Sequence, residues 1–469
     1  GRPSHGVQGI RDGTPRAEGG AAITAREKAL AILSRVDRGK AYADILLDRS
    51  LREKDITDPR DRALLTELVM GTLRRRGTLD HCLSPHLSRP LDRADSLVRN
   101  ALRLGAYQLL YTRVPERVAL FETVAAVKRA RGEKPAGLVN AVLRGVLRSG
   151  KTVVLPADGL LRKSVELSAP LPLLAALIRS LGEDEAYSFL SASLEKPPFV
   201  VRANTFRVLR EALQARLSRA GMEPAPCRYA KEGIVIGKPG LVHADRGFGS
   251  GEYLAMDEGA QLIAPLLSPR EGETVLDACA APGGKATHLS ALCRGKARIV
   301  AVDASAPRVK MLRETVARLC ALGVEAAVHD FAAGPLPGFA GRFDKALVDA
   351  PCTGMGVIRR NPDAKWRFQP EDPSRMASLQ LSILRGAWAS LAPGGLLAYS
   401  TCSPMREENE DVVEAFRRET GASLAGKEAA GKWPGPADAW TREGFLRLST
   451  HRHGTDYFFA ALLRKPASP

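Results

Sequence analysis

The sequence lacks any uninterrupted apolar run near the roughly 20 residues that a membrane-spanning helix requires. No charged segment followed by an apolar one opens the chain, so we expect no secretory signal. Only seven of the 469 residues are cysteines, and none lies in a Cys-x-x-Cys pair or in a cluster with zinc-ligand spacing. We therefore expect reduced thiols, a cytoplasmic protein without a membrane partner, and no metal site.

Negative charge is scarce relative to positive charge. Lys and Arg number 69 against 52 Asp and Glu, a net charge of +17, and residues 23–150 alone carry 25 basic against 15 acidic side chains. Such an excess favours a polyanionic partner, because neutralised phosphates release their condensed counterions. Charge by itself does not separate RNA from DNA, a membrane surface or simple solubility.

The spacing of apolar residues separates the first part of the chain into three segments. Residues 1–22 are rich in Gly, Pro and Arg without periodicity, and we expect a disordered leader. Residues 23–150 show helical spacing interrupted by turn clusters, which predicts an all-α domain of about six helices. Residues 151–165 have the composition of a linker.

Strand patterns begin after this linker. Residues 166–268 mix helical and strand patterns and predict a small α+β domain. Residues 269–469 alternate short apolar runs with longer helix-like segments, which predicts a doubly wound α/β domain with a mostly parallel sheet. The expected strands of this sheet are 274–276, 299–302, 324–329, 346–348, 396–399 and, at the edge of the sheet, 457–463.

The first strand of the predicted sheet runs through Asp277 into a loop that contains Gly283 and Gly284, and a helix follows. Open α/β sheets bind ligands beyond the carboxyl ends of their strands. The glycines permit close backbone approach, and a helix N-terminus offers free N–H groups. The loop matches neither a dinucleotide-binding Gly-x-Gly-x-x-Gly motif nor a Walker lysine loop, and a simple tight turn would also fit it.

Acidic residues close the next three strands: Asp303, Asp330 and Asp349. A carboxylate at the end of the second strand is placed to accept both hydroxyls of a ribose. Asp330 is placed to meet an adenine amino group. Together these acids favour a ribose-containing cofactor with few phosphates, although solvated acids at strand ends remain the alternative.

Two cysteines, Cys352 and Cys402, follow the fourth and fifth predicted strands. Adjacent parallel strands lie about 4.8 Å apart, so side chains one step beyond their ends share a cleft. A thiolate is a strong nucleophile, and its pKa falls near a cation such as Lys285 in the first loop. We therefore interpret these two thiols as reactive groups.

Several strings resemble the RNA cytosine-C5 methyltransferases, which have the Class I S-adenosylmethionine fold. The strings are DACAAPGGK (277–285), AVDAS (301–305), LVDAPCTGMGVIRRNPDAKW (347–366) and YSTCS (399–403). The VIRRNPDAKW segment is similar to the bacterial Sun/RsmB family, which modifies cytosine 967 of 16S rRNA. AREKALAILSRVDRGKAYADILLD (25–48) and GLVNAVLRGVLR (137–148) resemble the NusB-like RNA-binding domain of that family.

The resemblance implies a NusB-like all-α domain, a small α+β domain and a Rossmann-like catalytic domain with a seven-stranded sheet. It implies that Cys402 attacks carbon 6 of cytosine, that Cys352 assists release, that Asp349 contacts the N3/N4 edge and that Lys285 lies close to the reacting groups. Thiol addition suits this reaction because carbon 5 is a poor nucleophile until something adds to carbon 6. The residues implied to hold S-adenosylmethionine are Cys279, Ala280, Ala281, Pro282, Gly283, Gly284, Lys285, Asp303, Asp330 and Asp349.

The sequence departs from the family pattern at two places. Met256–Ala260 stands where Gln-Asp-x-x-Ser is usual, and Ser168-Ala169-Pro170 stands where Ser-His-Pro is common. These positions concern RNA contacts and hence the choice of cytosine. Two alternatives stay open: the same chemistry on tRNA or another rRNA site, and an RNA-binding assembly factor with an inert catalytic domain. The oligomeric state does not follow from the sequence, and a monomer is compatible with it.

Overall fold

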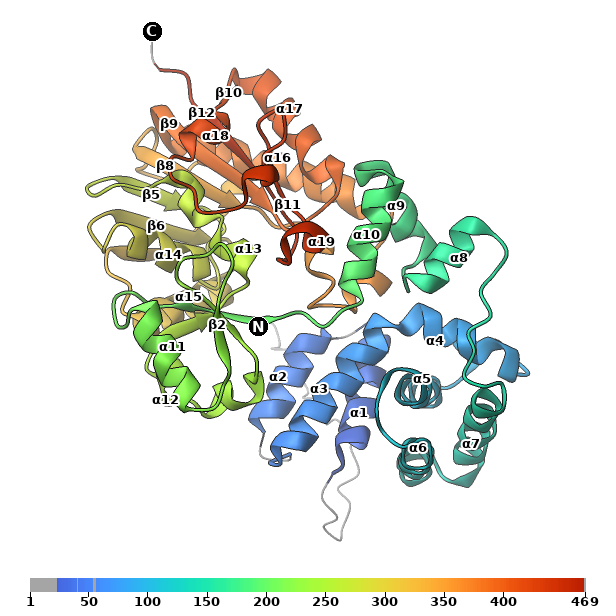
Figure 1. Ribbon diagram of the computed structural model, residues 1–469. Coiled ribbons are helices and arrows are strands. Elements are labelled where there is room, and N and C mark those ends of the chain that lie inside the picture. The colour runs from blue at the N-terminus through green and yellow to red at the C-terminus, as the bar shows by residue number, and fades with distance from the viewer. Residues whose placement is uncertain (1–22, 40, 54–55, 468–469) are drawn as a thin grey trace, which may run out of the picture.

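The computed structural model describes residues 23–39, 41–53 and 56–467 (Figure 1). The predicted leader, residues 1–22, lies outside the described residues. The blue helices form one region in Figure 1, and the yellow-to-red α/β region lies against it, with the green segments between them.

The first region is helical because apolar side chains recur at helical spacing and each helix buries that face. Its first helix begins at a capping box in which Thr24 and Glu27 bond each other's backbone N–H groups. The long helices are α1 (Ala25–Asp37), α2 (Ala43–Arg52), α3 (Pro59–Arg74), α4 (Arg76–Leu83), α5 (Ser96–Tyr111), α6 (Glu116–Arg131) and α7 (Glu133–Arg148). Short 3-10 helices η1 (Ser84–His86) and η2 (Leu91–Arg93) follow α4. The described part of this region has seven α-helices where about six were expected, and α3 and α4 meet at Arg75.

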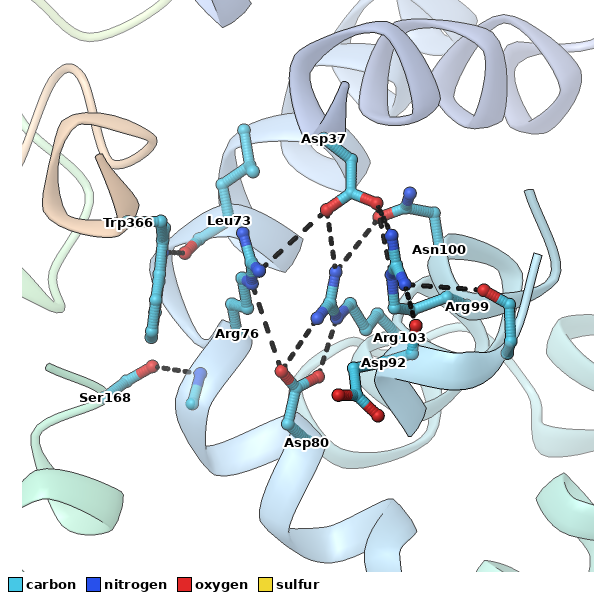
Figure 2. Close-up of polar contacts among 12 residues, drawn as sticks. Asp37, Leu73, Arg76, Asp80, Asp92, Arg99, Asn100, Arg103, Ser168 and Trp366 are labelled. Atoms are coloured by element: carbon cyan, nitrogen blue, oxygen red, sulfur yellow. Dashed lines mark hydrogen bonds and ion pairs between the residues drawn. The ribbon is translucent and has the colours of Figure 1, made fainter. Parts of the chain in front are cut away.

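A buried ion cluster lies in the centre of this helical region (Figure 2). Asp37 pairs with Arg99 and Arg103, and Arg103 also donates to both carboxylate oxygens of Asp80, at 2.6 and 2.8 Å. Burial alone would raise the pKa of Asp37, but the arginines outweigh it and lower that pKa. Arg76 connects the cluster to Trp366 of the α/β region. Its guanidinium lies 3.8 Å from Asp37 and 5.0 Å from the ring centre of Trp366.

Three helices connect the helical region to the rest of the chain: α8 (Gly159–Glu166), α9 (Leu171–Leu181) and α10 (Glu183–Ser193). The segment predicted as a linker, residues 151–165, thus contains most of α8. Among the described residues, no single helix has the length and apolar composition to cross a membrane. The pair α8 and α9 passes that test only together, and it is bent by 101°.

A small antiparallel sheet follows, with the strand order β2-β3-β1-β4. Leu213, Leu217, Ile234 and Tyr253 are fully buried in its core. The strands are β1 (Phe199–Ala203), β2 (Pro224–Pro226), β3 (Gly233–Ile236) and β4 (Tyr253–Ala255), and the helices are α11 (Arg210–Arg219), η3 (Pro239–Ala244), α12 (Arg246–Gly249), α13 (Glu258–Gln261) and η4 (Ala264–Leu267). The mixed pattern of residues 166–268 therefore forms an α+β arrangement.

The large sheet has the order β10-β12-β9-β8-β5-β6-β7, and β11 pairs with β12 outside this path. Five neighbouring strands, β9 to β7, are parallel, and the apolar runs of β5, β6, β8 and β9 are buried by helices on the faces of the sheet, whereas β7 at the edge is partly exposed. The strands are β5 (Thr274–Asp277), β6 (Arg298–Asp303), β7 (Val324–Val328), β8 (Phe343–Asp349), β9 (Leu391–Thr401), β10 (Ser423–Leu424), β11 (Leu446–Leu448) and β12 (Phe458–Arg464). The helices are α14 (Gly284–Leu292), η5 (Phe331–Ala333), η6 (Met355–Val357), η7 (Ala364–Trp366), α15 (Ala306–Leu319), α16 (Asp372–Ser390), η8 (Arg406–Glu408), α17 (Glu410–Thr420), α18 (Gly426–Ala429), η9 (Ala437–Ala439) and α19 (Thr450–His453).

The sheet differs from the sequence prediction in two respects. It has eight strands rather than seven. Two of them, β10 and β11, are short and pair with β12 over only two or three residues. The expectation that 457–463 forms the edge of the sheet is wrong. Strand β12 lies between β9 and these two short strands, which contain too few residues to show a strand pattern.

The segment Arg359–Arg367 bonds the α/β region to the helical region. The Lys365 ammonium is fully buried and donates to the carbonyls of Arg74 and Ser168, at 3.0 and 2.8 Å. The Trp366 indole donates to the carbonyl of Leu73 at 2.9 Å (Figure 2). These bonds satisfy carbonyls at the end of α3, so the two regions share one polar junction.

Candidate active site

The chemistry-bearing residues gather where the parallel strands of the large sheet end. Strand β5 is central, and its last residue, Asp277, is in register with Ala301 of β6 and Leu347 of β8. Asp349, which ends β8, is in register with Ser400 of β9. The loops after β5, β6, β8 and β9 therefore open on the same edge of the sheet.

The loop from Cys279 to Gly283 joins β5 to α14. Gly283 is the residue before the helix, with a φ of +108°, and a Cβ atom there would lie 2.9 Å from the Leu312 side chain. Only glycine fits this position without strain. Ala280 donates to the carbonyl of Val302 at 2.8 Å, and the Ala281 carbonyl accepts from Arg308 at 2.8 Å. The loop is thus held against the end of β6, with the first N–H groups of α14 at its far end.

The acids predicted at the strand ends differ in environment. Asp303 is buried, accepts from the N–H of Ser305 at 3.1 Å and lies 3.4 Å from the guanidinium of Arg308. Asp330 is exposed, and one carboxylate oxygen accepts from the N–H of Ala332 at 2.9 Å, capping η5. Asp303 therefore faces the loop after β5, whereas Asp330 lies at the solvent-facing rim.

Asp277 was not among the residues expected to bind the cofactor. Its position at the end of a strand, like that of Asp303, could have indicated such a role. It is fully buried, and neither carboxylate oxygen has a hydrogen-bond partner among the described residues. Burial, and then repulsion by Asp349, raise its pKa to about 7, against a smaller opposing effect of Lys285 and the nearby N–H of Cys279. An unpaired buried carboxylate calls for a cationic or hydrogen-bonding partner.

The two thiols predicted to be reactive lie side by side. The Sγ atoms of Cys352, after β8, and Cys402, after β9, are 3.3 Å apart. The contact with Cys402, and then burial, raise the pKa of Cys352 well above its ordinary value of 9.0. Cys352 therefore holds its proton at neutral pH.

Lys285 supplies positive charge beside these thiols. Its Nζ donates to Asp349 Oδ2 at 2.6 Å, and Ser400 donates to Asp349 Oδ1 at 2.7 Å. Burial alone would lower the pKa of Lys285, but Asp349 and then Cys402 outweigh it and raise that pKa. Lys285 is thus an ammonium group bonded to Asp349 and close to Cys402.

Glu408, at the end of η8, connects the two thiol-bearing loops and was not expected from the sequence. One carboxylate oxygen accepts from the backbone N–H of Thr353 at 2.8 Å, and the other accepts from the hydroxyls of Thr353, at 2.6 Å, and of Ser403. Thr353 follows Cys352, and Ser403 follows Cys402. The fully buried Glu408 therefore fixes the two sulfurs relative to each other.

Gly356, like Glu408, connects the two thiol-bearing loops. Its N–H donates to the carbonyl of Cys402 at 2.9 Å, and its own carbonyl accepts from the N–H of Tyr457 at 3.1 Å. A Cβ atom at this position would lie 2.6 Å from the Cys402 carbonyl oxygen. Backbone from three separate segments thus converges at the thiol pair. The arrangement places two thiols, a paired cation and a carboxylate together at one edge of the sheet.

The sequence matches three known families in the order of its regions. Residues 23–148 match the NusB family, residues 170–243 match the RsmF/B-like methyltransferase ferredoxin-like domain, and residues 264–464 match the 16S rRNA methyltransferase RsmB/F family.

Relatives match over nearly the whole length. A probable ribosomal RNA small subunit methyltransferase B of Bacillus subtilis (strain 168) is 34% identical over 443 residues, which are 94% of this chain and 98% of the relative. The ribosomal RNA small subunit methyltransferase B of Pseudomonas putida is 37% identical over 389 residues, or 83% of this chain and 87% of that protein.

Solved structures agree in fold. The crystal structure of PH0851 superposes with a TM-score of 0.80 at 25% identity and covers 95% of this chain and 100% of its own. A methyltransferase homologue protein from Pyrococcus horikoshii has a TM-score of 0.55 at 28% identity over 66% of this chain and all of its own. The chain therefore belongs to the RsmB/F family of 16S rRNA methyltransferases.

Proposed function

We propose that this protein transfers a methyl group from S-adenosylmethionine to carbon 5 of a cytosine in 16S rRNA, at a site of the cytosine 967 type. The observation that carries the proposal is the thiol pair, with Cys352 and Cys402 Sγ atoms 3.3 Å apart beside Lys285. A soft nucleophile is needed because carbon 5 gains nucleophilic character only after addition to carbon 6. The proposal includes a cytoplasmic location, where bacterial ribosomal RNA is found.

The residues at the strand ends fit the proposed cofactor. The unpaired carboxylate of Asp277 suits the cationic methionine portion, and Asp303 suits the ribose hydroxyls. The loop from Cys279 to Lys285 would hold the methionine portion, Asp330 would lie toward the adenine, and Asp349 would lie between cofactor and base. S-adenosylmethionine supplies the methyl group when bound.

The protein's own groups perform the remaining steps. The Cys402 thiolate adds to carbon 6, and the electrons of the ring double bond move toward the N3/N4 edge, which Asp349 contacts. Lys285, bonded to Asp349, places positive charge near that edge. Once carbon 5 carries the methyl group, a base takes its proton, the C5–C6 double bond re-forms, and the Cys402 sulfur leaves as a thiolate with the assistance of Cys352.

Cysteine variants test this assignment. Cys402→Ala should abolish methylation, whereas Cys352→Ala should accumulate an RNA–protein adduct that survives denaturing electrophoresis. The exposed Cys320, replaced by Ser, is the matched control and should keep wild-type turnover. Turnover in Cys402→Ala would refute its role as nucleophile, and a missing adduct in Cys352→Ala would refute the release role.

The identity of the RNA needs a separate measurement. Bisulfite sequencing of 16S rRNA and tRNA from a deletion strain and its parent shows which cytosine loses methylation. Loss at a single 16S position is the expected result. Loss confined to tRNA would keep the chemistry and refute the 16S assignment.

A further inference from the structure

A second cavity lies outside the thiol site, between β1 of the small sheet and the C-terminal half of α14. Its volume is about 430 Å³, and its walls include Arg202, Phe206, Glu232, His288 and Arg294. None of the residues discussed at the thiol pair lines it. Its size falls within the range of roughly 300–1,000 Å³ typical of small-molecule sites.

The inner wall carries a buried polar group without a partner. His288 is 2% exposed, and neither ring nitrogen has a hydrogen-bond partner among the described residues. Burial, and then the charge of Arg202, lower its pKa well below 6.5, so the imidazole is neutral. A neutral imidazole offers one donor and one acceptor, and a buried group of this kind requires a partner.

Charges of both signs surround this imidazole. The Glu232 carboxylate lies 3.9 Å from His288 Nε2, and the fully buried Arg202 guanidinium is close enough to lower the His288 pKa. Arg294 is exposed at the rim. A small anion would be repelled by Glu232, and a small cation would be repelled by both arginines. The walls therefore favour a neutral molecule with hydrogen-bonding groups.

Two apolar side chains also line the cavity. Phe206 is half-buried there, and Leu209 is 67% exposed, an uncommon exposure for a leucine beside a polar pocket. Flat aromatic and aliphatic side chains beside a polar inner wall are the arrangement with which proteins hold an unstacked RNA base.

We propose that this cavity binds one unpaired base of the RNA substrate, and that Glu232 accepts hydrogen bonds from an amino-bearing edge of that base. The inference rests on the proposed function only in taking RNA as the substrate. Guanine fits best, because its N1–H and 2-amino group both donate from one edge toward a carboxylate. Phe206 then stacks on the ring.

The site is linked to the cofactor loop through Arg202. This side chain donates to the carbonyl of Gly284 at 3.1 Å and to the Thr287 hydroxyl at 2.9 Å. Gly284 is the first residue of α14 and belongs to the predicted cofactor loop. A base in the cavity would contact the same arginine that fixes the start of this helix.

Fluorescence anisotropy with the full-length chain tests the proposal. The probes are a short single-stranded RNA with one guanosine and the same RNA with inosine, which lacks the 2-amino group. Wild-type protein should bind the guanosine RNA about tenfold more tightly, in line with the discrimination that a paired hydrogen-bond contact gives. Glu232→Gln should remove this preference, and Phe206→Ala should weaken both RNAs. Glu211→Gln makes the same chemical change at an exposed position on α11 and should leave binding unchanged.

Equal affinity of the wild-type protein for both RNAs would overturn the proposal, as would an undiminished guanosine preference in Glu232→Gln with an unchanged unfolding temperature. Binding of free GMP that matches RNA binding and competes with it would assign the cavity to a nucleotide effector and refute the RNA assignment. Binding does not require Cys402, so the same measurements on Cys402→Ala separate this inference from the proposed chemistry. A guanosine preference in a wild-type protein that does not methylate RNA would refute the proposed chemistry and leave this inference standing.

Discussion

Replacing Asp277 by asparagine removes a charge that the fold holds without a hydrogen-bonding partner. The pKa of Asp277 is raised from its ordinary value of 3.8 to about 7, mainly by burial. Because folding raises the pKa of this carboxyl group, the folded state holds its proton more tightly than the unfolded state does. The resulting contribution to the free energy of unfolding is fully present below the unfolded pKa and is lost as the pH rises through the folded pKa. The wild-type protein should therefore lose stability between about pH 4 and pH 7 on account of this group.

The size of the effect follows from the shift. About three pKa units at roughly 1.4 kcal/mol each amount to about 4 kcal/mol across the whole range. Between pH 5 and pH 7, the wild-type free energy of unfolding should fall by about 2 kcal/mol more than that of Asp277→Asn. Asp349, Lys285 and Asp303 lie near Asp277, but they are present in both proteins, so their own titration largely cancels in the comparison.

Urea denaturation followed by tryptophan fluorescence measures this difference. All four tryptophans lie between residues 366 and 440, so the signal reports on the catalytic region. Asp184→Asn, at an exposed position on α10, is the matched control and should follow the wild-type curve. Parallel curves for wild type and Asp277→Asn, within about 1 kcal/mol at every pH, would refute the reasoning.

Two further substitutions test the residues that connect the thiol-bearing loops, Glu408 and Gly356. Glu408→Ala should lower turnover about a hundredfold, because four donors on Thr353, Gln380 and Ser403 lose their acceptor and the two sulfurs lose their spacing. Glu408→Gln should lose far less turnover, because the hydroxyls can turn to accept from its amide. Equal losses of turnover in steady-state kinetics would contradict this reasoning. Gly356→Ala should cut turnover at least about tenfold, because its methyl group would press on the Cys402 and Tyr457 carbonyls. Gly137→Ala on α7 meets open space, so its turnover should equal that of wild type, and a similar loss in both alanine variants would argue against a local effect.

The strands of the large sheet could be predicted closely from the sequence. The expected strand 299–302 lies within Arg298–Asp303, and 346–348 lies within Phe343–Asp349, because buried parallel strands appear as continuous apolar runs. The break at Arg75 could not be placed from the apolar spacing, because Arg74, Arg75 and Arg76 carry no apolar pattern of their own. The interior position of β12 depends on pairing with short strands that carry no pattern of their own.

The candidate site divides in the same way. Cys352 and Cys402 could be placed in one cleft, because each follows a strand of the same parallel sheet. Glu408 could not be assigned, because its contact with Thr353 spans 55 positions and exists only after the fold has formed. The state of Asp277 likewise depends on burial and on the neighbouring Asp349, which no local pattern encodes.

The polar junction at Lys365 and Trp366 stands at the end of a stretch that begins at Cys352. Only thirteen positions separate Cys352 from Lys365, and along them the chain is bonded first to the Cys402 loop and then to the end of α3. A displacement of the helical region would pull on the backbone that carries one of the thiols. The position of the helical region and the spacing of the sulfurs are thus connected through a short length of polypeptide.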